Sequence, residues 1–121
     1  MARRRITPED GRRALTSVAA GSAGRPDLAM AVRFTLEELA ELAPGNSVEV
    51  RVPPFGVTQC VEGPRHTRGT PPNVVEMDAS TWLALVEGRT TWPDAVAAGK
   101  VAASGQRADL SAWLPLFGPR G

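Results

Sequence analysis

NVVEMDASTWLALVEGRTTWPDAVAAGKVAASG, the stretch of residues 73–105, predicts a strand, two short helices and a second strand in that order. Residues 73–78 are typical of a strand, and the carboxylate of Asp78 can then accept hydrogen bonds from the first amides of a helix. Gly88 ends this helix, because glycine readily adopts the backbone conformation that closes a last turn. Apolar residues at i, i+3 and i+4 give the helix one packing face: Trp82, Leu85 and Val86.

The second helix of this stretch is expected to begin at Thr91, whose hydroxyl can cap it, with Pro93 in its first turn. Gly99 ends the helix, and residues 100–104 return as a strand. If that strand ran parallel to residues 73–78, the crossover between the two would be right-handed. The stretch therefore indicates a soluble α/β unit with an apolar interior, and it contains no catalytic motif.

The charge of the chain changes along its length. The 121 residues are enough for one domain, with a net charge of +1 that favours neither nucleic acid nor a membrane surface as partner. Residues 1–25 carry six arginines and two acidic residues, whereas residues 26–121 carry eight basic and eleven acidic residues. We therefore expect a basic N-terminal helix or arm over residues 1–25 and one mildly acidic domain over residues 26–121.

Cysteine and histidine are each used once. A single cysteine, Cys60, rules out an internal disulfide, and a single histidine, His66, rules out the common zinc-binding patterns. We expect no metal and no cofactor. No run of residues has the apolar length of a signal-peptide core or of a membrane span. With a composition rich in Arg, Ala, Gly and Pro, the expected location is a bacterial cytoplasm.

Residues 26–43 predict the longest helix, which opens at Pro26 and stops before Pro44. Met30 and Phe34 fall beside its main apolar face. Either the N-terminal helix covers these two side chains, or they line a ligand entrance or a dimer contact. The main face has helical periodicity and consists of Leu28, Ala31, Val32, Thr35, Leu36, Leu39 and Leu42.

Residues 47–52 alternate between valine and charged side chains, which is typical of a strand with one face in water. A turn at residues 53–56 and a return through residues 57–61 complete the prediction of a hairpin. Cys60 is interpreted as a small buried hydrophobic residue, because no spaced histidine and acid support a nucleophile.

The irregular run EGPRHTRGTPP, residues 62–72, joins this hairpin to the next strand. Its Arg65, His66 and Arg68 are candidates for holding the acidic head group of a ligand, because arginine side chains match carboxylates and phosphates in geometry. The alternative is a solvated connection with no binding role.

The C-terminal residues predict one more short helix, capped by Asp109 and limited to about two turns by Pro115. An amphipathic segment of this kind needs a groove, so it either seals the core permanently or acts as a movable lid. Its apolar face has spacing i, i+3, i+4 and i+7 and consists of Leu110, Trp113, Leu114 and Phe117.

The second half of the chain resembles the sterol carrier protein family. It shares an acid at a strand end, an aromatic-leucine helix, a short alanine-bearing helix and a Gly-Lys-Val run that precedes a closing glycine. The upstream hairpin PGNSVEVRVPPFGVTQCVEG is similar to that of compact bacterial members, so the resemblance covers roughly residues 26–117. The residues that carry it in the second half are Asp78, Trp82, Leu83, Leu85, Gly88, Ala95, Gly99, Lys100, Val101 and Gly105.

This resemblance implies an α+β fold of two layers, a small and mostly antiparallel sheet with helices packed on one face. It also implies non-catalytic binding or transfer of a lipid-like apolar or amphipathic small molecule in a pocket between the layers. By analogy, the residues expected to line that pocket are Leu36, Leu39, Trp82, Leu85, Val86, Leu110, Trp113, Leu114 and Phe117.

Two other functions stay open at this level. The same fold with a filled core could be an interaction or dimerisation module, acting as a homodimer or as the accessory of a separate enzyme. An enzyme is the weakest of the three hypotheses, because Cys60 and His66 offer neither a base with an orienting partner nor a metal set.

Overall fold

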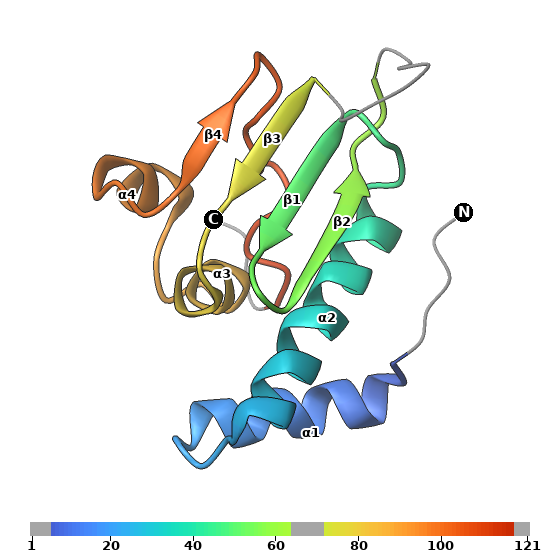
Figure 1. The fold of residues 1–121 in the computed structure, drawn as a ribbon, viewed down its shortest axis with the longest axis vertical. Helices are drawn as coiled ribbons and strands as arrows, with labels where there is room; N and C mark the ends of the chain where they lie inside the picture. The colour runs from blue at the N-terminus through green and yellow to red at the C-terminus, as the bar shows by residue number, and fades with distance from the viewer. Residues whose placement is uncertain (1–5, 64–71, 118–121) are drawn as a thin grey trace.

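The computed structural model describes residues 6–63 and 72–117. Within these residues the chain forms a compact α+β fold with a mixed four-stranded sheet, which confirms the expected fold class (Figure 1). No helix of the described residues is both long enough and apolar enough to cross a membrane. The elements are α1 (Pro8–Ala19), α2 (Arg25–Leu42), β1 (Val48–Val52), β2 (Gly56–Cys60), β3 (Asn73–Glu76), α3 (Ala79–Val86), α4 (Trp92–Ala97) and β4 (Ala102–Ser104).

The sheet has the strand order β2-β1-β3-β4. β1 runs antiparallel to β2, with Val48 opposite Cys60, and parallel to β3, with Val48 opposite Asn73. β4 runs antiparallel to β3. The sheet is therefore mostly antiparallel, as expected, and the right-handed crossover considered for residues 73–78 and 100–104 does not arise.

The two faces of the sheet differ in character. Val48, Val50 and Val52 of β1 are fully buried, whereas the intervening Glu49 and Arg51 are half-buried on the opposite face. Figure 1 shows α2 behind β2, with part of the C-terminal segment also behind the sheet. The alternation in the sequence therefore separates the apolar layer from the solvated layer.

Three helices begin at a side chain that caps their first turn, and two of these caps, Asp78 and Thr91, were predicted. The Asp78 carboxylate accepts a hydrogen bond from the Thr81 N–H at 2.8 Å, and the Thr91 hydroxyl accepts one from the Asp94 N–H at 3.3 Å. Thr7 caps α1 in the same way. Each side chain satisfies an amide that has no partner within its helix, so these local bonds fix the start of each element.

α1 packs against α2 and covers Phe34, which is 2% exposed. The ring lies so close to Gly11 that a Cβ at this position would overlap it. A hydrogen bond of 3.0 Å from the Ser17 hydroxyl to the Asp27 carboxylate also joins the two helices. The prediction that the N-terminal helix covers Phe34 is confirmed.

The prediction of a helix after Asp109 is wrong. Residues 111–113 form an isolated turn, in which the Trp113 N–H donates to the Leu110 carbonyl, and the chain then continues as an irregular segment. Pro115 has no N–H to extend the helix, and its ring conflicts with the carbonyl one turn earlier. The following amides, at residues 116 and 117, instead donate to the Val86 carbonyl at 3.0 and 3.2 Å, which attaches the segment to the end of α3.

Candidate ligand-binding site

The nine residues predicted to line an inter-layer pocket all belong to one hydrophobic cluster or pack against it. Leu36, Leu39, Trp82, Leu85, Val86 and Leu110 are buried in this cluster, and Trp113, Leu114 and Phe117 are partly buried against it. The structure therefore brings the predicted set together. Its role in ligand binding stays a prediction.

The interior of this cluster contains a hydrogen bond between two buried side chains. The indole Nε1–H of Trp82 donates to Thr35 Oγ1 at 2.8 Å, and this hydroxyl donates in turn to the carbonyl of Ala31, 2.8 Å away. Thr35 and Trp82 are both fully buried. The bond links α2 to α3 and compensates the cost of placing polar atoms in an apolar core.

A ring contact attaches the C-terminal segment to α2. The rings of Phe34 and Phe117 stack with centroids 6.5 Å apart and an interplanar angle of 15°. Phe34 thus packs between α1 and the end of the described chain. The sequence predicted both side chains as apolar contacts but gave no sign that they meet.

A hollow lined by described residues lies between α2 and the hairpin of β1 and β2. We call it the α2–hairpin cleft. Its volume is about 630 Å³, which is within the range of about 300–1,000 Å³ that is usual for small-molecule sites. Its lining residues are Ile6, Pro26, Ala29, Met30, Arg33, Leu36, Glu37, Phe55, Gly56, Val57 and Thr58.

The walls of the cleft are mainly apolar. Met30 lines it from α2, and a ligand entrance at this residue stays a prediction. Val57 is 58% exposed, although it lies in a strand, and Phe55 is half-buried in the preceding turn. Only Leu36 belongs both to this cleft and to the predicted inter-layer set. Met30, which lies beside the main apolar face of its helix, was the signal in the sequence that could have pointed to this surface.

Two arginines stand beside the cleft. Nε of Arg33 donates to the carbonyl of Phe55 at 2.9 Å, and the guanidinium of Arg25 lies 5.2 Å from the centroid of the Phe55 ring. Both arginines are exposed, and no carboxylate among the described residues forms an ion pair with either. At the other side, a carboxylate oxygen of Glu37 accepts a hydrogen bond from the Ile6 N–H at 3.2 Å.

Among the described residues, the remaining candidate side chain is that of Cys60, and it adds no reactive group. Arg65, His66 and Arg68 lie outside the described residues. Cys60 is buried, as predicted, and burial raises the pKa of its thiol to about 12, so that the thiol stays neutral. In the part of the chain that the structure covers, no group of three or more His, Cys, Asp or Glu side chains could hold a metal.

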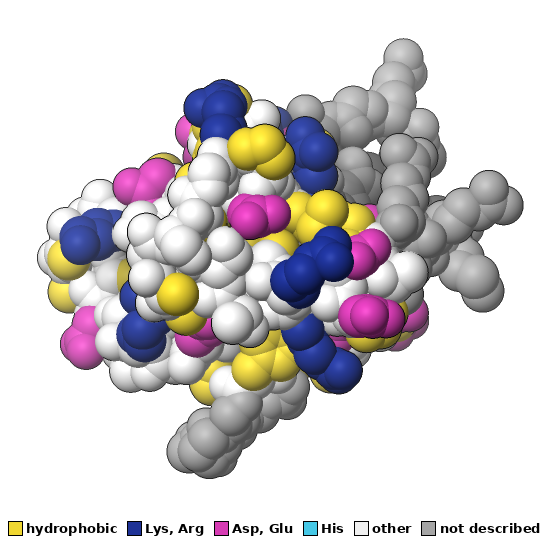
Figure 2. All heavy atoms as spheres, turned by 90° about the horizontal axis from the view of Figure 1, so that it is seen from below, with side chains coloured by type: hydrophobic (Ala, Val, Ile, Leu, Met, Phe, Trp, Pro, Cys, Tyr) yellow, Lys and Arg dark blue, Asp and Glu magenta, His cyan; other side chains and the backbone are white. Residues whose placement is uncertain are grey.

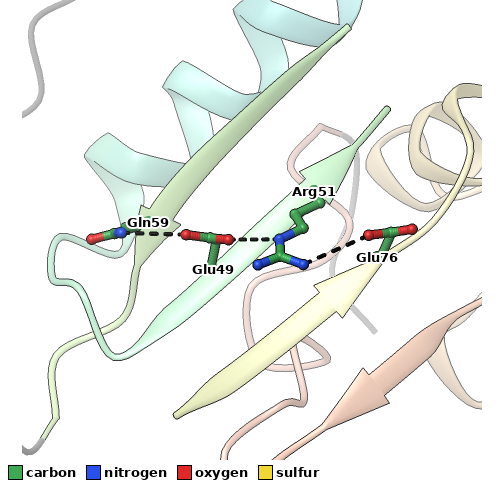
Figure 3. A network of polar contacts seen from close by, with 4 residues as sticks. All are labelled: Glu49, Arg51, Gln59 and Glu76. Carbon is green, nitrogen blue, oxygen red and sulfur yellow. Dashed lines mark hydrogen bonds and ion pairs between the residues drawn. The ribbon is translucent and has the colours of Figure 1, made fainter. Parts of the chain in front are cut away.

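The solvated face of the sheet carries a row of polar contacts across three strands (Figure 3). Nε of Arg51 lies 2.6 Å from the Glu49 carboxylate, and its terminal nitrogen lies 4.0 Å from that of Glu76. Gln59 donates to Glu49 from β2 at 3.4 Å. These contacts keep the face polar. Figure 2 shows the molecule from below, where hydrophobic patches alternate with side chains of both charges, and no single sign covers that face.

Fold and cleft together define the chain as a small α+β domain with an apolar surface hollow between a helix and a hairpin. The profile of a protein family described as bacterial SCP ortholog matches residues 24–116. The chain therefore belongs to the sterol carrier protein family, as the resemblance of its sequence implied. The match begins at the end of the loop before α2 and leaves α1 outside. A search of curated proteins found no match.

Proposed function

We propose that this protein binds or carries a lipid-like, apolar or amphipathic small molecule without chemical conversion, and that the α2–hairpin cleft holds it. The observation that carries this proposal is a hollow of about 630 Å³ whose walls are mainly apolar and whose border carries two arginines. Membership of the sterol carrier protein family supports the same class of ligand.

The arrangement of the side chains suggests how such a ligand would lie. Its apolar part would contact Met30, Leu36 and Phe55 and would be removed from water there, which stabilises binding by roughly 25 cal/mol per Å² of buried apolar surface. An acidic head group would lie near the guanidinium groups of Arg25 and Arg33. Nε of Arg33 is held by the Phe55 carbonyl, so its terminal N–H groups are already oriented.

The inter-layer pocket remains a second location for the ligand. Leu39, Trp82 and Val86 are fully buried there, so a ligand between the layers would have to displace packed side chains or the C-terminal segment. The same filled core supports the alternative function, an interaction or dimerisation module that binds no small molecule.

Native mass spectrometry of the protein purified from its own host, followed by organic extraction, tests the proposal directly. A co-purifying apolar molecule is the expected result. Titration with the fluorescent dye 1-anilinonaphthalene-8-sulfonate and displacement by dodecanoate then measures affinity. Binding of neither dodecanoate nor any co-purified molecule would overturn the proposed function and favour the interaction module.

A variant pair locates the site. Ala29 is half-buried on the cleft wall, and Ala97 is exposed on α4, away from the cleft. Ala29→Trp fills the cleft and should weaken dodecanoate binding at least tenfold, whereas Ala97→Trp should leave it unchanged. Equal affinity in both variants would place the ligand elsewhere.

A further inference from the structure

We propose that α1 is a latch for the C-terminal segment, residues 113–117. Through the ring of Phe34, α1 holds this segment closed over the apolar core, and release of α1 lets the segment open. This inference goes beyond the proposed function, because it concerns access to the core rather than binding in the α2–hairpin cleft.

Phe34 contacts both parts of the latch. Its ring lies so close to Gly11 of α1 that a Cβ at this position would overlap it, and it stacks on the ring of Phe117 with centroids 6.5 Å apart. Phe34 is only 2% exposed. Because a packed interior leaves no free space, a shift of this ring must displace its neighbours, and Phe117 is one of them.

The glycine of this contact is explained by the space around it. Gly11 lies inside α1 and is not among the residues with positive φ, so the backbone would accept any residue. Glycine also destabilises the interior of a helix relative to alanine. At Gly11 the missing side chain lets the Phe34 ring approach the backbone of α1, and the helix is less stable by itself as a result.

α1 is held to the rest of the protein by a small buried surface. Its buried residues are Gly11, Ala14 and Leu15, of which only Leu15 has a large side chain. A hydrogen bond of 3.0 Å joins Ser17 to Asp27 of α2. Isolated helices of about 12 residues are marginal in water, and elements that bury little apolar surface open at low free energy. α1 can therefore detach while the sheet stays folded.

The C-terminal segment is also attached at few points. Residues 113–117 are irregular and half-buried, and the N–H groups of residues 116 and 117 donate to the Val86 carbonyl at 3.0 and 3.2 Å. The stack of Phe117 on Phe34 is a contact of this segment with α2. When Phe34 moves, that contact is lost and the attachment to the end of α3 remains.

Opening of the segment would change the inter-layer set predicted from the sequence. Trp113, Leu114 and Phe117 belong to that set and lie on the segment itself, whereas Trp82 and Val86 are fully buried in the closed state. The latch therefore controls whether an apolar molecule reaches the core between the layers.

Hydrogen exchange followed by NMR tests the latch in the full chain without ligand. Gly11→Ala displaces the Phe34 ring, although alanine favours the helix itself. We expect the amides of Leu116 and Phe117 to exchange at least tenfold faster, relative to the amides of β1, than in the wild type. This ratio is the readout, because a uniform loss of stability would accelerate both sets. Gly24→Ala is the control, since a Cβ there meets only Pro26, at 3.6 Å, and it should leave the ratio unchanged.

Two further variants complete the test. Leu15→Ala removes the largest side chain that α1 buries and should raise the same ratio, which decides the matter if Gly11→Ala does not fold. Phe117→Ala should accelerate exchange in α1, because coupling between two sites is reciprocal. An unchanged ratio in a folded Gly11→Ala or Leu15→Ala variant, or amides of α1 that do not respond to Phe117→Ala, would overturn the latch. Dodecanoate binding is measured separately, so a failure of the proposed function would leave this result intact.

Discussion

Replacing Thr35 with valine removes the acceptor of the hydrogen bond that joins α2 to α3. In the folded protein the indole N–H of Trp82 lies 2.8 Å from Thr35 Oγ1, and both residues are fully buried. Valine has a size similar to that of threonine but cannot accept this bond. The indole N–H would then stay in the apolar core without a partner.

The expected cost follows from this geometry. A buried donor left unsatisfied costs roughly 1–3 kcal/mol, whereas the whole domain has a stability of roughly 5–15 kcal/mol. At about 4 °C per kcal/mol for a domain of this size, Thr35→Val should lower Tm by about 4–12 °C. The substitution therefore tests whether the two helices are held together by this bond or by apolar packing alone.

Urea unfolding followed by far-UV circular dichroism measures the loss, and Thr16→Val is the matched control. Thr16 is exposed on α1, and its hydroxyl donates to the Arg12 carbonyl at 3.0 Å, the same helical bond that Thr35 makes to Ala31. We expect the control to change the free energy of unfolding by less than about 0.5 kcal/mol. A Thr35→Val variant that is no less stable than Thr16→Val would refute the reasoning.

Two further predictions concern pH. Because burial raises the pKa of the Cys60 thiol to about 12, the folded protein keeps a proton that the unfolded chain loses near its ordinary value, and stability should fall as pH rises above about 9. At pH 8, 5,5′-dithiobis(2-nitrobenzoate) should label the thiol only in denaturant; rapid labelling of the folded protein would contradict this. The pKa of the Asp78 carboxyl is lowered, first by the hydrogen bond from the Thr81 N–H. The stability that the charged carboxylate contributes is therefore present above the pKa of Asp78 in the unfolded chain, and it is lost as pH falls through the lower pKa in the folded protein. Asp78→Ala should therefore lower the free energy of unfolding by about 1 kcal/mol at pH 7 and by less at pH 2, with Asp109→Ala as the control. An equal loss at both pH values would argue against this assignment.

The start of each capped helix was predictable because capping is local. Thr7, Asp78 and Thr91 each bond an amide three residues ahead, so a few neighbouring letters of the sequence contain the interaction. The failed helix after Asp109 shows the limit of local periodicity. The spacing of its apolar residues was helical, but the N–H groups of residues 116 and 117 donate to the carbonyl of Val86 in α3. No local pattern in the sequence encodes that partner.

The α2–hairpin cleft was only partly predictable for the same reason. Met30 stood out because it is an apolar residue that lies beside the main apolar face of its helix. Phe55 and Gly56 looked like ordinary turn residues, and they line the cleft because of how closely the hairpin approaches α2, which depends on the sheet register and on the bond from Arg33. Sequence periodicity identifies which face of an element is apolar, but not the distance between two elements.

The size of the domain supports a ligand site at the surface rather than between the layers. Side chains that border an empty cavity lose their packing, at roughly 24 cal/mol per Å³. For a closed cavity equal in volume to the cleft, about 630 Å³, this rate gives a cost of about 15 kcal/mol, as large as the whole stability of a typical domain. A cleft at the surface fills with water when no ligand is present and avoids most of that cost. A domain of 121 residues can thus keep Leu39, Trp82 and Val86 tightly packed and still offer an apolar surface of useful size on the other side of Leu36.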